Sequence, residues 1–535
     1  MRLHLIGSIV LLVVLGGKLN SQVGKDTFAI RGNVVDAVTG RPMERAEVSI
    51  ATIEHLDKPV QELLSGNDGS FSFSGLRPGK YLLVGRKSGF NEQSYEQHGS
   101  FASAIVVGPG LTSDHVIFRL HPDSVIGGKI TDSENEAVTN ATVLLFRRDA
   151  NSGFMHTSQV AQTMSDDRGY YHFGHLGSGR YFVVVSAQPW YSSIAASLHE
   201  SPEYDPIAAD SLHLDMVYPA TYYPGVTDSS SASPIVLNEN QNIIADLVLV
   251  PTPALRITIN HADSFSSGVS LKQSIFGTLV DAASTEHAPV GDTVEISGIA
   301  SGTYILELDS RSASAALHGR VVELGEDAII DANSSAVLPA VRGKIQIEGE
   351  LNLDPQAFVR LWNSRTGGAV DTALAANGEF SFNQDFVIPG TYSVFLINGE
   401  SLMVGTISAT GAKVIGQSIQ VNGSTPVYLS IRLSHTLSTI TGMARRKGKP
   451  FPGAMIILVP EDADSNWPLF RRDQSDSDGS FTLRDILPGK YKLIAIENGW
   501  NLEWADPALL KTHLDHAIGT EIHPNTKSEI TVEVQ

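Results

Sequence analysis

A chain of 535 residues is too long for one hydrophobic core, and at ~100–200 residues per domain it predicts about three to five domains. Its 42% hydrophobic and 18% charged residues exclude an intrinsically disordered chain, and the absence of cysteine excludes disulfides, thiolate metal sites and cysteine nucleophiles. A net charge of −20 repels phosphate backbones and anionic lipid, so we predict no nucleic-acid partner.

The first residues have the pattern of an export signal. Arg2 and His4 precede an apolar run from Leu5 to Leu15, which is shorter than the ~20 apolar residues that a membrane-spanning helix needs. We therefore predict a signal peptide at residues 1–21, with an uncleaved anchor as the alternative, and no membrane-spanning segment in the mature chain. Export without cysteine is typical of a bacterial envelope protein, so we expect a secreted, periplasmic or cell-surface location.

Residues 27–120 contain the first copy of a repeated pattern. Two alternating apolar segments lead to Asp68-Gly69-Ser70-Phe71-Ser72-Phe73 and then, after a turn, to Pro78-Gly79-Lys80-Tyr81. Asp-Gly supplies the positive φ of a tight turn, and Phe71 and Phe73 lie on the same face of the following strand. We expect Tyr81 to bury its ring while its hydroxyl bonds a nearby backbone group, as in a tyrosine corner. We interpret these positions as turn and core residues.

The pattern recurs at intervals of roughly 100 residues, which is the size of a small β-sandwich. Its tyrosines are Tyr81, Tyr181, Tyr304, Tyr392 and Tyr491. The copy at Tyr304 is degraded, because Asp292 occupies the position of the first turn glycine. We therefore predict an all-β fold, a tandem array of about five Ig-like β-sandwich modules. The predicted modules are residues 27–120, 121–250, 251–337 (degenerate), 338–436 and 437–535.

The Asp-Gly-x-Phe…Pro-Gly-x-Tyr pattern resembles the carboxypeptidase regulatory-like domain, a transthyretin-like (prealbumin-like) sandwich of the carbohydrate-binding-like superfamily. The resemblance covers residues near 28–120, 121–250, 338–436 and 437–535 well, and 251–337 only weakly. It implies the fold and leaves the function open, because such modules serve as spacers, adhesive units and glycan binders alike. The catalytic motifs of carboxypeptidases are missing, so the resemblance implies no peptidase activity.

The second module departs most from the repeat, through an insertion at residues 187–233. Its aromatic residues include Trp190, Tyr191, Tyr204, Tyr218, Tyr222 and Tyr223. Loops between sandwich strands commonly carry function, and exposed Trp and Tyr rings stack on sugars or anchor protein interfaces. We predict binding residues at Trp190, Tyr191, Tyr222 and Tyr223. The alternative is that these rings cover an open edge or end of the module.

Acidic residues gather before the last copy of the pattern. Aligning Gly479 with the invariant glycine of a calcium loop puts Asp476, Asp478 and Asp485 at ligand positions. Gln474 occupies the first position, however, and a solvated turn explains the same residues. We therefore predict no metal and no cofactor, and keep calcium at Asp476, Asp478 and Asp485 as a weak candidate.

Two tryptophans near the C-terminal end of the sequence, Trp500 and Trp504, precede Leu509-Leu510. Their spacing predicts a short helix or turn that packs against the fifth module.

We find no Gly-x-Ser-x-Gly elbow, His-Glu-x-x-His helix or phosphate-binding loop, so the predicted protein is not an enzyme. The favoured function is non-catalytic binding or adhesion in the envelope, with a glycan or an envelope protein as partner. A passive scaffold or spacer is the main alternative, and an unrecognised hydrolase is a remote one. The short proline-bearing linkers at residues 120–123 and 250–253 predict a rod or a gently bent string of modules. The oligomeric state is not predicted.

Overall fold

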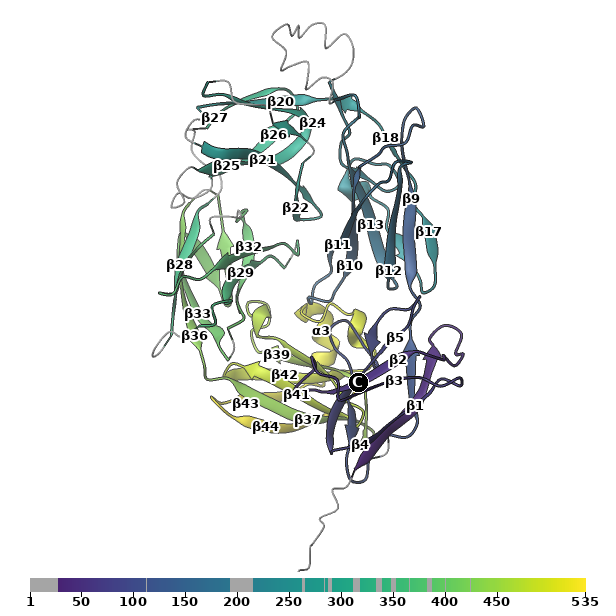
Figure 1. Ribbon diagram of the computed structural model, residues 1–535. Helices are drawn as coiled ribbons and strands as arrows, with labels where there is room; N and C mark the ends of the chain where they lie inside the picture. Colours follow the sequence, from purple (N-terminus) through teal and green to yellow (C-terminus); the bar gives the residue numbers. More distant parts are fainter. Residues whose placement is uncertain are drawn as a thin grey trace, which may run out of the picture.

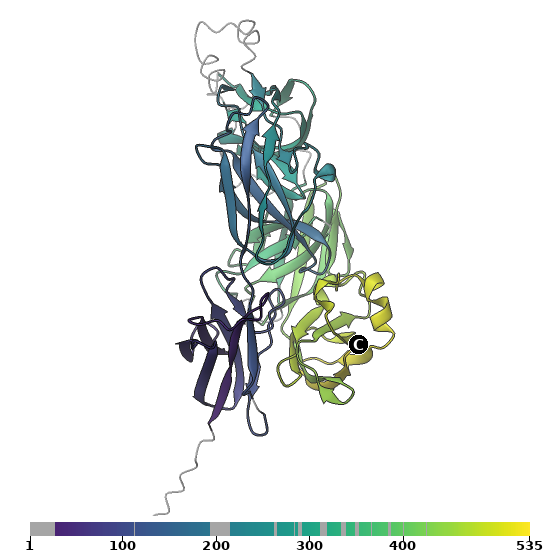
Figure 2. The ribbon, with the colours of Figure 1, turned by 90° about the vertical axis from the view of Figure 1, so that its right-hand side faces the viewer.

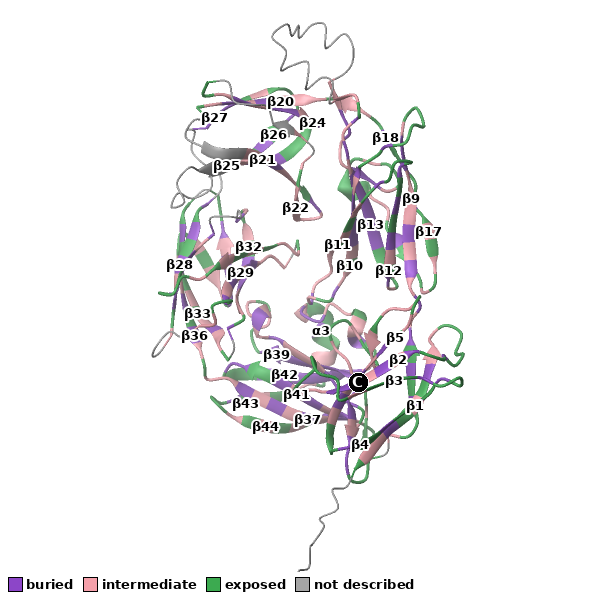
Figure 3. Cartoon of the chain, viewed as in Figure 1, coloured by how far each residue is buried: buried purple, intermediate pink, exposed green. Residues whose placement is uncertain are grey.

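The computed structural model describes residues 27–535, apart from 112, 193–214, 262–264, 283, 287–290, 311–317, 333–338, 348–352, 365, 383–386, 400 and 424. The predicted signal peptide at residues 1–21 and Tyr204 lie outside the described residues. Alternation builds the strands: in β4 (Ser70–Leu76), Phe71 and Phe73 are buried whereas Ser70 and Ser72 are exposed. Buried residues recur along the strands of every module (Figure 3). The predicted all-β array of sandwich modules is confirmed.

The repeated tyrosine has the predicted role in all five modules. Each ring is buried, and each hydroxyl donates to the backbone carbonyl four positions earlier, at a distance of 2.8 to 3.0 Å. The pairs are Tyr81 with Arg77, Tyr181 with Gly177, Tyr304 with Ala300, Tyr392 with Ile388, and Tyr491 with Leu487. The bond gives the hydroxyl, which burial removes from water, a hydrogen-bond partner. The degenerate third module forms the same tyrosine corner as the other four.

The turn before β4 also follows the prediction. Gly69 has φ of 74°, and the corresponding Gly169, Gly378 and Gly479 have φ of 81°, 78° and 82°. These are left-handed values that glycine adopts without a steric penalty.

Module 1 packs two sheets around a core that includes Ile30, Phe73 and Phe118. One sheet has the order β4-β1-β8, and the other has the order β3-β2-β5, with β6 and β7 also paired to β5. Its other strands are β1 (Phe28–Asp36), β2 (Glu47–Thr52), β3 (Gln61–Leu64), β5 (Gly79–Arg86), β6 (Gln93–Ser94), β7 (Ile105–Val107) and β8 (Val116–Leu120).

Module 2 has the same plan, with a core that includes Ile126, Tyr171 and Tyr181. Its elements are β9 (Ser124–Asp132), β10 (Thr142–Asp149), β11 (His156–Met164), β12 (Tyr170–Leu176), β13 (Gly179–Ser186), β14 (Met216–Val217), β15 (Thr221–Tyr222), η1 (Ser229–Ser231), β16 (Ile235–Leu237), β17 (Asn242–Ile244) and β18 (Leu247–Leu249). The following β19 (Thr252–Pro253) pairs with β14.

Modules 3 and 4 each have a separate core, around Ile257 and Tyr304 in module 3 and around Leu361 and Tyr392 in module 4. Module 3 contains β20 (Leu255–Asn260), β21 (Phe265–Ile275), β22 (Thr278–Asp281), β23 (Thr285–Glu286), β24 (Val294–Ile299), β25 (Gly302–Ser310), β26 (His318–Leu324) and β27 (Ala328–Asp331). Module 4 contains β28 (Val341–Gln346), β29 (Phe358–Trp362), β30 (Ala369–Ala373), β31 (Glu379–Ser381), β32 (Gly390–Ile397), β33 (Met403–Thr410), β34 (Ala412–Ile415), β35 (Ser418–Val421) and β36 (Val427–Ser434).

Module 5 has a core that includes Ile440, Phe481 and Tyr491. It contains β37 (Ser438–Arg446), β38 (Lys449–Pro450), β39 (Met455–Pro460), η3 (Trp467–Leu469), β40 (Arg471–Gln474), β41 (Ser480–Ile486), β42 (Gly489–Ile496), η4 (Gly499–Asn501), α3 (Pro507–Leu514), β43 (Ile518–Ile522) and β44 (Lys527–Glu533). The shared topology is clearest at the ends of the modules: β8, β18, β27, β36 and β44 each run parallel to the first strand of their module.

The five modules follow one another around a closed ring, in which module 5 returns to module 1 (Figure 1). The view turned by 90° shows the purple module 1 and the yellow module 5 side by side (Figure 2). Direct hydrogen bonds join them, for example from the Ala104 N–H to the Asp476 carboxylate at 2.8 Å. The expectation of a rod or gently bent string is therefore wrong. Contacts between modules, such as those of Ala104 with Asp476 and of Tyr222 with Phe276, accompany this curvature of the chain.

Candidate binding site

Trp190 is the exposed member of the predicted aromatic group. It is 69% exposed, and its ring lies edge-on to that of the half-buried Tyr191, with 5.7 Å between the centroids. The two residues follow directly after β13 and a short segment, Ala187 to Pro189, at the end of module 2. Trp190 is thus held at the end of a buried strand with much of its indole open to solvent.

Tyr222 is buried instead of exposed. It is 5% exposed and lies in a cluster with Phe146 and Phe182 of module 2 and Phe276 of module 3. The Tyr222 and Phe276 rings meet edge-to-face at 5.4 Å, and burial raises the pKa of Tyr222 to about 12. Its assignment as a ligand-binding residue is corrected: Tyr222 packs modules 2 and 3 together.

Tyr223 is half-buried and packs against the core of module 2, and Tyr218 is itself part of that core. The four predicted binding residues therefore do not form one exposed surface. Trp190 and Tyr191 lie together, whereas Tyr222 and Tyr223 stabilise the module, as the alternative interpretation of the insertion expected.

A groove of about 810 Å³ lies beside Trp190, between modules 2 and 3. Its described lining is dominated by amide and hydroxyl side chains. These are Thr139, Asn140, Thr142, Gln159, Gln162, Ser186, Gln188, Ser192 and Ser284. The charged residues that line it are Lys272 and Asp281. The Lys272 ammonium forms an ion pair with Glu307 at 2.9 Å. Asp281 therefore gives the groove a small negative charge.

An indole beside amides and hydroxyls is suited to a neutral, hydroxylated ligand. The indole face covers the apolar face of a ring, while the amides exchange hydrogen bonds with hydroxyl groups. Sequence reasoning missed Gln159, Gln162, Lys272 and Asp281. One sequence feature could have indicated this groove: β11, with the sequence HTSQVAQTM, has few large apolar residues for a strand. Polar residues in that pattern are equally typical of a strand face in water.

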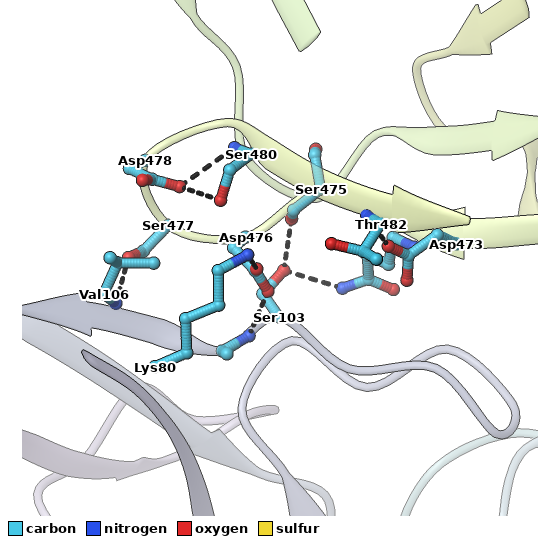
Figure 4. Close-up of polar contacts among 12 residues, drawn as sticks. Lys80, Ser103, Val106, Asp473, Ser475, Asp476, Ser477, Asp478, Ser480 and Thr482 are labelled. Carbon is cyan, nitrogen blue, oxygen red and sulfur yellow. Dashed lines mark hydrogen bonds and ion pairs between the residues drawn. The ribbon is translucent and has the colours of Figure 1, made fainter. Parts of the chain in front are cut away.

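The candidate calcium ligands do not converge. Asp476 accepts from the Lys80 ammonium and the Ala104 N–H of module 1, while Asp478 accepts from Ser480 within its own turn (Figure 4). Asp485 has a left-handed φ of 56°, and its carbonyl accepts from Arg471. Across the part of the chain that the structure describes, no group of three or more His, Cys, Asp or Glu side chains could hold a metal. The calcium candidate is therefore wrong.

These residues instead form the interface between modules 1 and 5. Ser103 donates to the Ser475 carbonyl, Ser477 N–H donates to the Ala104 carbonyl, and Val106 N–H donates to Ser477 Oγ, all within 3.0 Å (Figure 4). Gln474 Nε2 donates to Ser103 Oγ and to the Glu96 carbonyl. Because Ser103, Gln474 and Ser475 are at most 1% exposed, these bonds are shielded from water.

Burial raises the pKa of Asp473, next to this interface, to about 6, and hydrogen bonds from the Thr482 and Gln474 N–H groups oppose the shift. Burial also raises the pKa of Asp476, against the opposing effect of Lys80.

The prediction for Trp500 and Trp504 is confirmed and extended. Trp504 is 9% exposed and packs with Leu510 of α3 in a cluster of module 5. Trp500 stacks on His98 of module 1, with 4.8 Å between ring centroids and 8° between planes. The Arg472 guanidinium lies 4.1 Å from the Trp504 centroid and donates to the Asn151 carbonyl of module 2. Modules 1, 2 and 5 therefore meet around these rings.

Within the described residues, no helix is long and apolar enough to cross a membrane.

Comparison with known proteins finds a similar family for the first two modules. The family described as "Carboxypeptidase regulatory-like domain" matches residues 29–120 and 125–200. No curated protein matches the chain.

The solved structures that match include a streptococcal ancillary pilin, 11% identical, which covers 52% of this chain and 98% of its own at a TM-score of 0.18. The minor pilin GBS52 of Streptococcus agalactiae is 11% identical and covers 42% of this chain and 97% of its own, at a TM-score of 0.21. The major pilin subunit BcpA of Bacillus cereus is 10% identical. It covers 95% of this chain and 99% of its own at a TM-score of 0.14. At such TM-scores, nothing about function follows from the likeness. Residues 29–120 and 125–200 are therefore similar to carboxypeptidase regulatory-like domains, in a chain of tandem β-sandwiches.

Proposed function

We propose that this chain is a non-catalytic, exported binding or adhesion protein of a bacterial envelope that holds a glycan in the groove beside Trp190. The observation that carries the proposal is that Trp190, which is 69% exposed, lines a groove together with amide and hydroxyl side chains. Aromatic rings at a surface stack on the apolar faces of sugar rings, and they contribute much of the binding energy at recognition sites.

Export and location belong to the same proposal. The apolar segment after Arg2 and the absence of cysteine support a signal peptide at residues 1–21 and an extracytoplasmic destination. The division into domains at residues 27–120, 121–250, 251–337, 338–436 and 437–535 is likewise proposed, and the separate cores support it.

The ring gives the groove a rigid frame. Tyr222 and Phe276 hold module 2 against module 3, and the contacts of Ser103 with Gln474 and Ser475 hold the two ends of the ring together. A site between two modules keeps its shape only when the modules keep their relative position, so these contacts support a preorganised site.

The test is a glycan array with the chain lacking residues 1–21, compared with two variants. Trp190→Ala removes the exposed indole. Tyr170→Ala is the matched control, because Tyr170 is 52% exposed on the other sheet of module 2. We expect a neutral glycan to be retained by the parent chain and the control, and lost with Trp190→Ala. A parent chain that retains no glycan would instead support a passive scaffold.

A further inference from the structure

A second cavity, of about 470 Å³, lies where modules 2, 3 and 4 meet. Module 2 contributes Ser158 and Gln159 to its lining, module 3 contributes Lys272 and Thr278, and module 4 contributes Ala369 among others. None of the predicted binding residues lines this cavity. It is therefore distinct from the surroundings of Trp190.

The two cavities adjoin. Gln159 of β11, Lys272 of β21 and Leu279 of β22 line both of them. Gln159 thus lies at the boundary between the groove beside Trp190 and the cavity that module 4 lines.

The second cavity has the same chemistry as the first. Its described polar residues carry hydroxyl or amide groups, at Ser158, Gln159, Ser274, Thr278, Asn363, Thr366 and Tyr392. Its charged residues are Lys272 and Glu307, which pair with each other at 2.9 Å. Asp281 in the first cavity and the net charge of −20 oppose an anionic ligand.

We propose that the two cavities are consecutive subsites for one neutral oligosaccharide, which runs from Trp190 past Gln159 into the junction of modules 2, 3 and 4. This inference rests on the proposed function and adds the ligand class to it: an extended, uncharged sugar chain rather than a single sugar or an acidic polymer. Three modules form the path, so the ring arrangement creates a site that no module has alone.

The experiment measures affinity against chain length. The probes are di-, tetra- and hexasaccharides of β-1,4-glucose, α-1,4-glucose and β-1,4-mannose, with polygalacturonate oligomers of the same lengths as the acidic comparison. We expect the affinity for one neutral series to rise at least about tenfold from disaccharide to hexasaccharide, and the acidic series to bind more weakly at every length.

Two variants locate the second subsite. Ala369 is exposed on β30 and lines the second cavity, so Ala369→Trp fills that cavity without entering a core. It should abolish the gain with length and leave disaccharide affinity unchanged, whereas the control Ala369→Ser should keep the gain. Ser158→Tyr fills the same cavity from module 2 and should reproduce Ala369→Trp, which protects the test against misfolding of one variant.

The outcomes separate the two proposals. A disaccharide that binds as tightly as the hexasaccharide, or a gain with length that survives both filling variants, would overturn the extended site and leave the site at Trp190 intact. If no neutral series binds at any length, the proposed function and this inference both fail.

Discussion

Lys80 of module 1 and Asp476 of module 5 form an ion pair with 2.5 Å between Nζ and Oδ2, although 396 positions separate them in the sequence. Their side chains are 24% and 12% exposed, so the pair is largely shielded from water. Asp476 also accepts from the Ala104 N–H, which ties the pair to the backbone of module 1.

We predict that Asp476→Ala separates modules 1 and 5. The substitution leaves the Lys80 ammonium and the Ala104 N–H without their acceptor, and removing one partner of a buried pair costs ~3–5 kcal/mol at full burial. Energy transfer between dyes on modules 1 and 5 should fall. Asp478→Ala is the control, because Asp478 bonds Ser480 within its own turn, and it should leave the transfer unchanged. Equal transfer in all three proteins would show that the pair does not hold the interface.

Asp473 gives the stability of module 5 a dependence on pH. Burial raises its pKa from 3.8 to about 6 in the folded chain, so the folded state binds the proton more tightly than the unfolded state does. The resulting stability is fully present below the unfolded pKa and is lost as the pH rises through about 6. Asp476 shifts in the same direction.

We therefore predict that Asp473→Asn flattens the fall in stability between the two pKa values. Urea unfolding of the parent and the variant at a series of pH values measures it. The variant also loses an acceptor for the Thr482 N–H, which lowers its stability at every pH, so the slope is the decisive quantity. If the free energy of unfolding falls with pH equally steeply in both proteins, Asp473 is not the source of the pH dependence.

The tyrosine corner of module 5 contributes to stability through one hydrogen bond. Tyr491→Phe keeps the buried ring but leaves the Leu487 carbonyl without its donor, which should lower the free energy of unfolding by about 1–3 kcal/mol. Tyr170→Phe, at an exposed ring, should change it by less than ~0.5 kcal/mol. Chemical denaturation measures both. A loss as small for Tyr491 as for Tyr170 would argue against the hydrogen bond.

Tyr222 should behave as a packing residue. Tyr222→Ala removes a buried ring from the contact between modules 2 and 3 and should cost ~3–5 kcal/mol. Tyr222→Phe keeps the ring, so both stability and glycan affinity should stay close to the parent values. A selective loss of glycan affinity in Tyr222→Phe, with unchanged stability, would restore the original binding assignment.

The sandwiches could be predicted from the sequence because their signals are local. Gly479, Phe481 and Tyr491 act within one turn and two strands, and each has a conformation or burial that its residue type favours. A further local signal was missed. Ser65, Ser165 and Ser475 are buried four positions before the turn glycines of their modules. Each serine hydroxyl accepts a hydrogen bond from a backbone N–H and donates one to a backbone carbonyl.

The ring and much of the groove could not be predicted in this way. Ser103 and Gln474 meet only because the modules curve back on one another, and neither belongs to a pattern that would indicate a partner. Tyr222 and Trp190 are both aromatic residues of one insertion, and composition does not distinguish a ring that packs a neighbouring module from a ring that faces solvent.

The most direct measurement of the central claim is a calorimetric titration of the retained neutral glycan into the parent chain, Trp190→Ala and Tyr170→Ala. We predict that Trp190→Ala weakens binding at least about tenfold, equivalent to ~1.4 kcal/mol, while Tyr170→Ala matches the parent. Equal affinity in all three proteins would contradict a glycan site beside Trp190.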